Sequence, residues 1–156
     1  MSHAPKLVAV EAGDRENFMV VAEKHFRELN PLFQPDRDWR DSYFEKIRSN
    51  QSCSLCWIVA GGERAGFVLY GIEDHRFLPR KTGSIYELYV VPQWRRKGMA
   101  RACAELVISE LWKSSPSKIQ LEVAEGNSAA AGLWRSLGFR KASERLVLAR
   151  NSQAVL

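Results

Sequence analysis

Apolar positions change their spacing several times along the chain, and each change predicts a new element. Spacings of three and four predict amphipathic helices over residues 15–29, 39–50, 98–114 and 128–138. Runs rich in β-branched and aromatic residues predict strands over residues 6–12, 54–60, 65–73, 84–91 and 118–125, with a last strand or pair of strands over residues 139–150. The predicted element order is therefore β-α-α-β-β-β-α-β-α-β.

Gly61 and Gly62 separate the second and third predicted strands, and two apolar runs around a glycine turn indicate a hairpin. Hairpins add antiparallel pairs to a sheet, whereas strand–helix–strand units add parallel pairs. We therefore expect the α/β class, with a mixed, mostly antiparallel central sheet flanked by helices. A chain of 156 residues fits one domain, so we expect a single domain over residues 1–156.

Composition narrows the class of protein further. Apolar residues make up 46% of the chain, yet no apolar stretch approaches the roughly 20 residues of a membrane span. We therefore expect a cytoplasmic protein that has no membrane partner. Cys53 and Cys56 form a C-x-x-C pair, but no second pair follows at zinc-site spacing, so we expect no bound metal.

The whole chain has a net charge of +5. One turn concentrates the positive charge, whereas acids and bases alternate along the rest of the chain. Arg95, Arg96 and Lys97 stand between a predicted strand and a predicted helix, and Gly98 and Ala100 follow them. Unpaired backbone N–H groups at a helix start attract anions, and glycine allows a phosphate to approach the backbone. The turn is either such an anion site or a solvated basic turn. Only Trp94 interleaves an aromatic ring with these cations, so we expect no nucleic-acid partner.

Two stretches resemble the signatures of the GNAT superfamily of N-acetyltransferases. The first is Leu88-x-Val90-x-Pro92-x-x-Arg95-x-x-Gly98-x-Ala100, and the second is Asn127-x-x-Ala130-x-x-Leu133-Trp134-x-x-Leu137-Gly138-Phe139. The resemblance implies an acetyl-CoA-dependent N-acetyltransferase that acts on a primary amine of a small molecule or peptide. The amine would attack the thioester directly in a ternary complex. Members of the family are often dimers, which makes a homodimer one expectation for this chain.

The resemblance also implies which residues bind the acetyl-CoA. The backbone of residues 96–100 would hold the pyrophosphate, that of residues 89–91 would pair with the pantetheine arm, and the Val90 amide would face the thioester oxygen. Asn127 would bind near the pantetheine, or would serve only as a helix N-cap. The full cofactor-binding set comprises Leu88, Val90, Val91, Arg95, Arg96, Lys97, Gly98, Met99, Ala100, Asn127 and Trp134.

The catalytic groups are harder to assign. Trp134 stands where the family often has a tyrosine acid, and an indole N–H cannot act as a general acid. Tyr89, or else Tyr86, is the candidate to protonate the leaving thiolate. Glu87 is the candidate base, with Glu122 and simple desolvation of the amine as alternatives.

The candidate residues that bind the amine acceptor are Phe33, Trp39 and Glu87. The histidines at positions 3 and 25 show no pattern that predicts a role. Because of Trp134, a non-catalytic acyl-CoA-binding or sensing module on the same fold is the alternative function.

Overall fold

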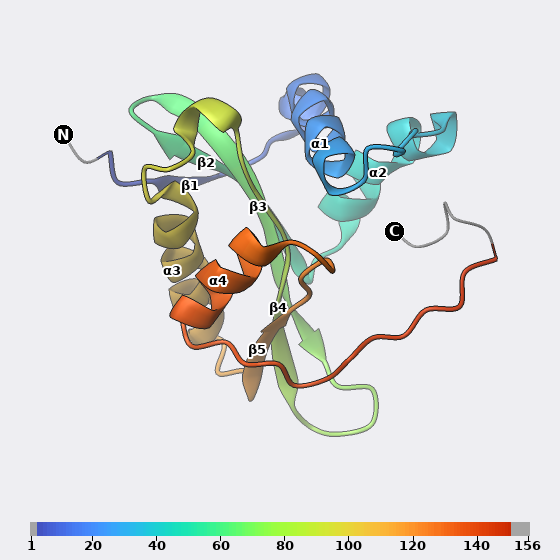
Figure 1. Cartoon of the computed structure of the whole chain (residues 1–156), viewed down its shortest axis with the longest axis vertical. Coiled ribbons are helices and arrows are strands. Elements are labelled where there is room, and N and C mark those ends of the chain that lie inside the picture. Colours follow the sequence, from blue (N-terminus) through green and yellow to red (C-terminus); the bar gives the residue numbers. More distant parts are fainter. Residues whose placement is uncertain (1–2, 151–156) are drawn as a thin grey trace.

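A five-stranded sheet forms the centre of the computed structural model, which describes residues 3–150 (Figure 1). The strands lie in the order β1-β2-β3-β4-β5 and comprise Lys6–Ala9, Cys53–Ala60, Glu63–Asp74, Lys81–Val90 and Lys118–Leu121. The first four strands pair antiparallel, and only β4 and β5 pair parallel. The mixed, mostly antiparallel sheet predicted from the sequence is therefore confirmed.

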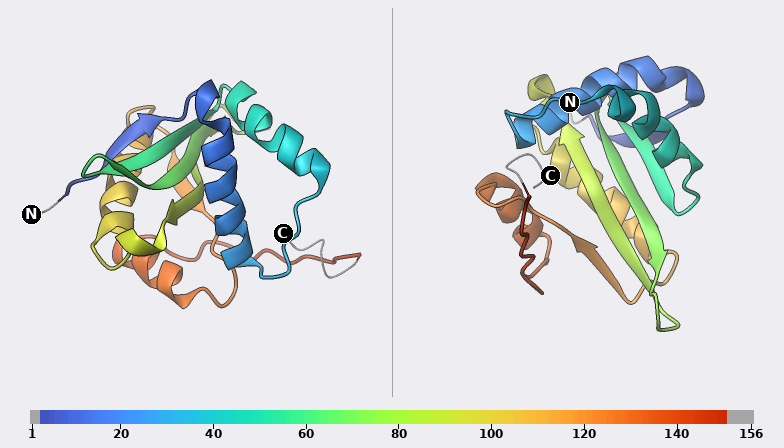
Figure 2. Two further views of the ribbon diagram at one scale, coloured as in Figure 1. Left: turned by 90° about the horizontal axis from the view of Figure 1, so that it is seen from above. Right: turned by 90° about the vertical axis from the view of Figure 1, so that its right-hand side faces the viewer.

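Four α-helices cover the two faces of the sheet (Figure 2). Helices α1 (Arg15–Leu29) and α2 (Arg37–Ser49) bury Phe18 and Phe44 against Trp57 and Phe67 on one face. Helices α3 (Met99–Trp112) and α4 (Ser128–Ser136) pack on the opposite face, in a second apolar cluster that includes Val107. Strands β2, β3 and β4 alternate their side chains between these two clusters, which gives a three-layer sandwich.

The β2–β3 turn shows the hairpin that the glycines predict. Gly61 and Gly62 have φ values of 58° and 79°, which are the left-handed conformations of a two-residue hairpin turn. Two short 3-10 helices, Ala12–Asp14 and Pro92–Trp94, were not anticipated by the apolar pattern. None of the helices within residues 3–150 is both long enough and apolar enough to cross a bilayer.

The β4–β5 ladder is short, and this positions the site. Pairing runs only from Thr82 to Ile85 on β4, opposite Lys118 to Leu121 on β5. Beyond Ile85 the two strands separate, so the later half of β4 has a strand neighbour only on its β3 side. A bulge between Leu69 and Tyr70 shifts the β3–β4 register at the same level.

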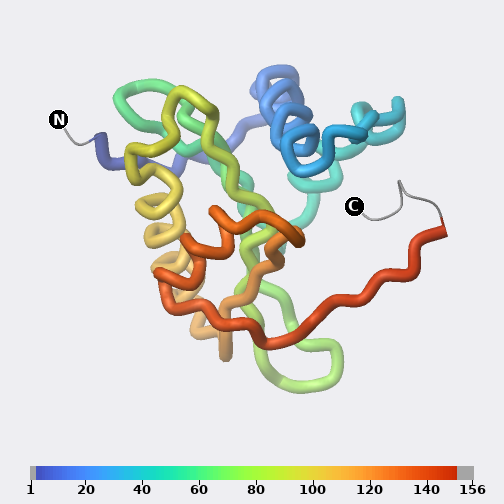
Figure 3. The backbone as a smooth tube through the Cα atoms, viewed as in Figure 1, coloured from blue at the N-terminus to red at the C-terminus, as the bar shows by residue number. Residues whose placement is uncertain are grey.

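The predicted strand over residues 139–150 is wrong. The chain from residue 139 onward forms neither a helix nor a strand within the described part, and it passes the lower end of the sheet before running away from it (Figure 3). Leu146 and Leu148 are 86% and 101% exposed. The apolar run has the composition of a strand, but it pairs with no strand of the sheet, and without a pairing partner its backbone forms no ladder.

Candidate active site

A cavity of about 930 Å³ opens where β4 separates from β5. Its wall comes from the end of α1, the end of β4, the turn before α3, the first turn of α3, the loop over residues 124–127, and α4. The positions predicted to bind the cofactor that contribute to this wall are Leu88, Val90, Arg95, Arg96, Gly98, Met99, Ala100, Asn127 and Trp134. The structure thus brings both sequence signatures to one cavity.

The turn before α3 has the conformation of an anion-binding turn. Arg96 and Gly98 have φ values of 59° and 72°, so two left-handed residues curve the backbone just before the helix. A Cβ atom placed on Gly98 would meet nothing within 4 Å, which shows that this side of the glycine is open. The first helical hydrogen bond joins the Ala102 N–H to the Gly98 carbonyl, which leaves the amides of residues 99–101 without helical partners.

A second helix start faces the same cavity. The Asn127 side chain accepts a hydrogen bond from the Ala130 N–H at 3.1 Å and so forms the N-cap of α4. Asn127 also belongs to the cavity wall. Two helix N-termini therefore converge on one space, and both favour negative charge there.

The free edge of β4 supplies further backbone groups. The Val91 N–H donates to the Ala65 carbonyl on β3 at 2.8 Å. Since successive backbone groups of a strand point to opposite edges, the N–H and C=O of Val90 point away from β3, toward the separation from β5. The Val90 carbonyl accepts from Arg95 Nε at 2.8 Å, which leaves the Val90 N–H facing the cavity.

The three consecutive cations have three different environments. Arg95 donates through Nη2 to both carboxylate oxygens of Glu28, at 2.9 and 2.7 Å, and so joins the turn to α1. Lys97 places its ammonium over the Trp94 ring, 5.0 Å from the centroid, and is not part of the cavity wall. Arg96 lines the cavity and has no ion pair with any residue between 3 and 150. Of the three side chains, that of Arg96 lines the cavity without an ion pair to any described residue.

Tyr89 reaches the cavity from β4 beside this ion pair. Its hydroxyl donates to Glu28 Oε1 at 3.1 Å, and the Arg95 guanidinium lies 5.4 Å from its ring centroid. Burial and the adjacent Glu28 carboxylate raise the Tyr89 pKa. The phenol therefore stays protonated and can donate at neutral pH.

Trp134 combines a core contact with a cavity contact. It is 8% exposed and packs edge-on against Phe139, with 5.4 Å between the ring centroids. It also contributes to the cavity wall opposite β4. Its position suits contact with a bound thioester, but the indole supplies no acid.

Glu87 of β4 is joined to His25 of α1. The distance from His25 Nε2 to Glu87 Oε2 is 2.5 Å. His25 is 6% exposed and lines the cavity, whereas Glu87 does not. The side chains come from positions 62 residues apart, which is why sequence reasoning missed His25.

The predicted acceptor residues belong to an aromatic cluster beside this pair. Phe26, Phe33, Trp39 and Tyr43 lie with neighbouring ring centroids 5.0 to 5.8 Å apart. Burial raises the Tyr43 pKa, and the negative charge of Glu87 raises it further. The cluster therefore adjoins Glu87, although Phe33 and Trp39 are not part of the cavity wall.

Glu122 and Tyr86 lie away from the cavity. The Glu122 carboxylate pairs with Arg145 at 2.8 Å, and its side chain is 75% exposed. The Tyr86 hydroxyl donates to Glu73. Neither side chain lines the cavity.

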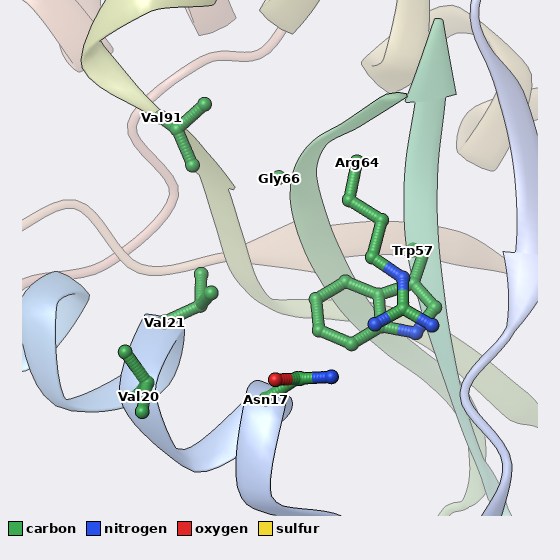
Figure 4. A pocket seen from close by; sticks show the side chains of 7 residues that line it. All are labelled: Asn17, Val20, Val21, Trp57, Arg64, Gly66 and Val91. Carbon is green, nitrogen blue, oxygen red and sulfur yellow. The ribbon is translucent and has the colours of Figure 1, made fainter. Parts of the chain in front are cut away.

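Val91 faces a different, smaller cavity of about 250 Å³. Figure 4 shows Asn17, Val20 and Val21 on α1 opposite the Arg64 guanidinium, which stacks on the Trp57 ring 4.3 Å from the centroid. Asp14 holds both residues, because it accepts from Arg64 at 2.6 Å and from Trp57 Nε1 at 3.1 Å. These groups already satisfy one another, and we assign the small cavity no role in the site.

Several residues of the large cavity were not predicted from the sequence. These are His25, Glu28 and Leu29 of α1, Trp94, Arg101, Ala124 to Gly126, and Ala129, Ala130 and Leu133 of α4. Ala130 and Leu133 belong to the second signature, so that signature could have indicated them. No sequence motif marks the α1 residues, because they line the cavity only through the packing of α1 beside β4.

The protein is an α/β sandwich with a cavity where β4 and β5 separate, and two helix N-termini face that cavity. The chain belongs to the Acetyltransferase (GNAT) family, whose pattern matches residues 19–139. That match spans both helix starts and the whole of β4.

Individual relatives match either a smaller part of the chain or the whole chain at low sequence identity. The [ribosomal protein bS18]-alanine N-acetyltransferase of Escherichia coli (strain K12) is 39% identical over 62 residues, which is 40% of this chain and 42% of that protein. The match therefore spans less than half the length of that relative.

Solved structures share the fold. A ribosomal-protein-alanine N-acetyltransferase from Brucella melitensis biovar Abortus 2308 has a TM-score of 0.76 at 18% identity, covering 94% of this chain and 99% of that one. An aminoglycoside acetyltransferase from an uncultured soil metagenomic sample has a TM-score of 0.69 at 14% identity, covering 96% of both chains.

Proposed function

We propose that the protein transfers the acetyl group of acetyl-CoA to a primary amine of a small molecule or peptide, by direct attack in a ternary complex. The observation that carries the proposal is the cavity at the separated edge of β4, where two helix N-termini converge. Membership of the GNAT family supports the same reaction. We also propose that it acts in the cytoplasm.

The residues present fit acetyl-CoA. The open side of Gly98, the unpartnered amides of residues 99–101 and the Arg96 side chain suit a pyrophosphate. The free edge of β4 beside Leu88 and Val90 suits an extended amide-containing arm, which would pair like an added strand. When bound, acetyl-CoA supplies a thioester whose carbonyl carbon accepts an amine and whose thiolate leaves.

The chain's own groups would then act on that thioester. The Val90 N–H donates toward the carbonyl oxygen, where negative charge develops during attack. Tyr89 is the tyrosine among the residues that line the cavity, and its hydroxyl can protonate the leaving thiolate. An ordinary thiol pKa of about 8.5 makes this assistance modest.

Trp134 is the reason to retain a second candidate, a non-catalytic acyl-CoA-binding module. The decisive experiment measures thiol release from acetyl-CoA with a panel of amines, which includes peptides with free N-termini, polyamines and aminoglycosides. Amine-dependent thiol release supports the transferase. Tight coenzyme A binding without release across the whole panel would favour the binding module.

A further inference from the structure

His25 is a buried histidine that none of the signatures includes, and it forms part of the cavity wall. It is 6% exposed, and the rings of Phe26, Phe67 and Tyr89 surround it at centroid distances of 5.1, 5.6 and 5.2 Å. These contacts fix the plane of the imidazole. A histidine held only as core packing would need no charged partner, yet this one has Glu87.

The bond to Glu87 determines which nitrogen of the ring is free. Nε2 lies 2.5 Å from Glu87 Oε2, and a carboxylate can only accept, so Nε2 carries the hydrogen. In the neutral ring Nδ1 is then the unprotonated nitrogen with its lone pair available.

Nδ1 is also accessible. It has no hydrogen-bond partner among residues 3–150, and no side-chain nitrogen or oxygen in that range is both buried and unpartnered. Nδ1 is therefore not completely buried, and the cavity that His25 lines is the large one.

We propose that His25 is the proton acceptor for the amine substrate and that Glu87 is a positioning residue acting through His25. The inference deepens the proposed function and rests on it, because it concerns the amine used at the same site. His25 rather than Glu87 is then the base, because His25 lines the cavity and Glu87 does not.

The proton balance is simple. An ammonium substrate gives one proton to Nδ1, which leaves a neutral amine and an imidazolium that the Glu87 carboxylate stabilises. The amine nitrogen then forms a bond to the acetyl carbon, the carbon–sulfur bond breaks, and its electron pair leaves on sulfur. The Tyr89 hydroxyl gives its proton to the thiolate, and the second proton of the nitrogen restores that hydroxyl. His25 returns its proton to solvent through the cavity.

The charged and titratable groups around His25 come from four segments. Glu87 and Tyr89 face it from β4, Glu28 lies one turn further along α1, Tyr43 adjoins Glu87 from α2, and Arg95 follows β4 and is paired with Glu28. Arg95 and Glu28 neutralise each other, so Glu87 is the unbalanced charge next to the imidazole.

Two substitutions separate a proton acceptor from a structural contact. His25→Gln keeps an N–H that can donate to Glu87 but has no group that takes up a proton near neutral pH. Glu87→Gln keeps a hydrogen-bond acceptor but removes the negative charge. His75→Gln, in the exposed connection between β3 and β4, is the matched control.

We expect His25→Gln to lower kcat at pH 7 by about 100-fold or more, the range of general base catalysis. The loss should shrink as pH rises, because hydroxide then deprotonates the amine without help. Glu87→Gln should lower kcat in the same direction, and coenzyme A affinity should not change in either variant. In the wild type, ¹⁵N NMR of His25 should show Nε2 protonated and Nδ1 unprotonated.

Each contrary outcome has a distinct meaning. Wild-type kcat and pH profile in His25→Gln, or an Nδ1-protonated ring, overturns the inference and leaves the transferase function intact. A pH-independent loss in His25→Gln assigns the residue a purely structural role and also overturns it. Absence of amine-dependent turnover in the wild type overturns the proposed function, and the role of His25 with it.

Discussion

Gly98 combines a backbone requirement with an open face. Its φ of 72° lies in the left-handed region, and a Cβ there would point into free space. A side chain at this position therefore costs some backbone strain and projects where the proposed pyrophosphate binds. Strain and charge can be separated, because asparagine and aspartate tolerate left-handed backbone about equally.

Gly98→Asp should weaken coenzyme A binding about 1,000-fold more than Gly98→Asn does. The two side chains have the same shape, and at an effective dielectric of 20 a like charge about 4 Å from a phosphate costs roughly 4 kcal/mol. Titration calorimetry with coenzyme A measures the difference. Equal affinities in the two variants would show that no anion binds beside Gly98.

The site was predictable wherever its residues are adjacent in sequence. The order of Arg95, Gly98 and Ala100 after a strand indicates an anion-binding turn by itself, and Asn127 indicates a helix start. His25 was not predictable, because a single histidine on the apolar face of a helix looks like a core residue. Its meaning depends on Glu87, which only the packing of α1 on β4 brings near.

At the scale of elements, α3 packs against the sheet through a row of small and apolar side chains that includes Cys103. Cys103 is fully buried, and desolvation raises its pKa from 9.0 to about 12. The unfolded chain ionises this thiol above pH 9, whereas the folded chain does not. Cys103 therefore contributes stability that is fully present below pH 9 and is lost as pH rises toward 12.

Cys103→Ala should consequently flatten the alkaline dependence of stability. A single thiol of this kind lowers the free energy of unfolding by up to about 1.4 kcal/mol per pH unit above pH 9. Urea unfolding at pH 8, 9 and 10 measures the slopes of the wild type and the variant. Identical slopes would show that the Cys103 thiol ionises in the folded protein as readily as in the unfolded chain.

Elements with a strong local pattern were predicted closely, and elements defined by distant partners were not. Helix α1 begins and ends as predicted, because its apolar face repeats regularly over fifteen residues. Strand β5 ends at Leu121, four residues before the predicted end, since β4 offers pairing only over four positions. The expected last strand failed for the same reason, because composition does not reveal which sheet edge is available.

At the scale of the whole molecule, the described segment after Phe139 adds little to the sandwich. Arg145 forms an exposed ion pair with Glu122, and such pairs contribute at most about 1 kcal/mol. Leu146, Val147 and Leu148 are more than half exposed. The core therefore consists of the two clusters on either side of the sheet.

Replacing Leu146, Val147 and Leu148 together by serine should change the free energy of unfolding by less than about 0.5 kcal/mol. As the control, Leu111→Ala on α3, where the side chain is 2% exposed, should cost about 2–5 kcal/mol. Urea denaturation measures both variants. A loss above about 1.5 kcal/mol in the triple variant would show that this segment packs on the domain in solution.

The short β4–β5 ladder has a consequence for the amount of protein in a cell. Only four residue pairs join β5 to the sheet, so the side of the cavity formed after β5 by residues 124–127 and α4 is held by little backbone pairing. Acetyl-CoA bound across this gap would contact both sides of the cavity and hold them together. At 100 times its Kd it would stabilise the folded protein by about 2.7 kcal/mol. Proteases cut the opened form, so the lifetime of the protein would then follow the supply of its own acetyl donor.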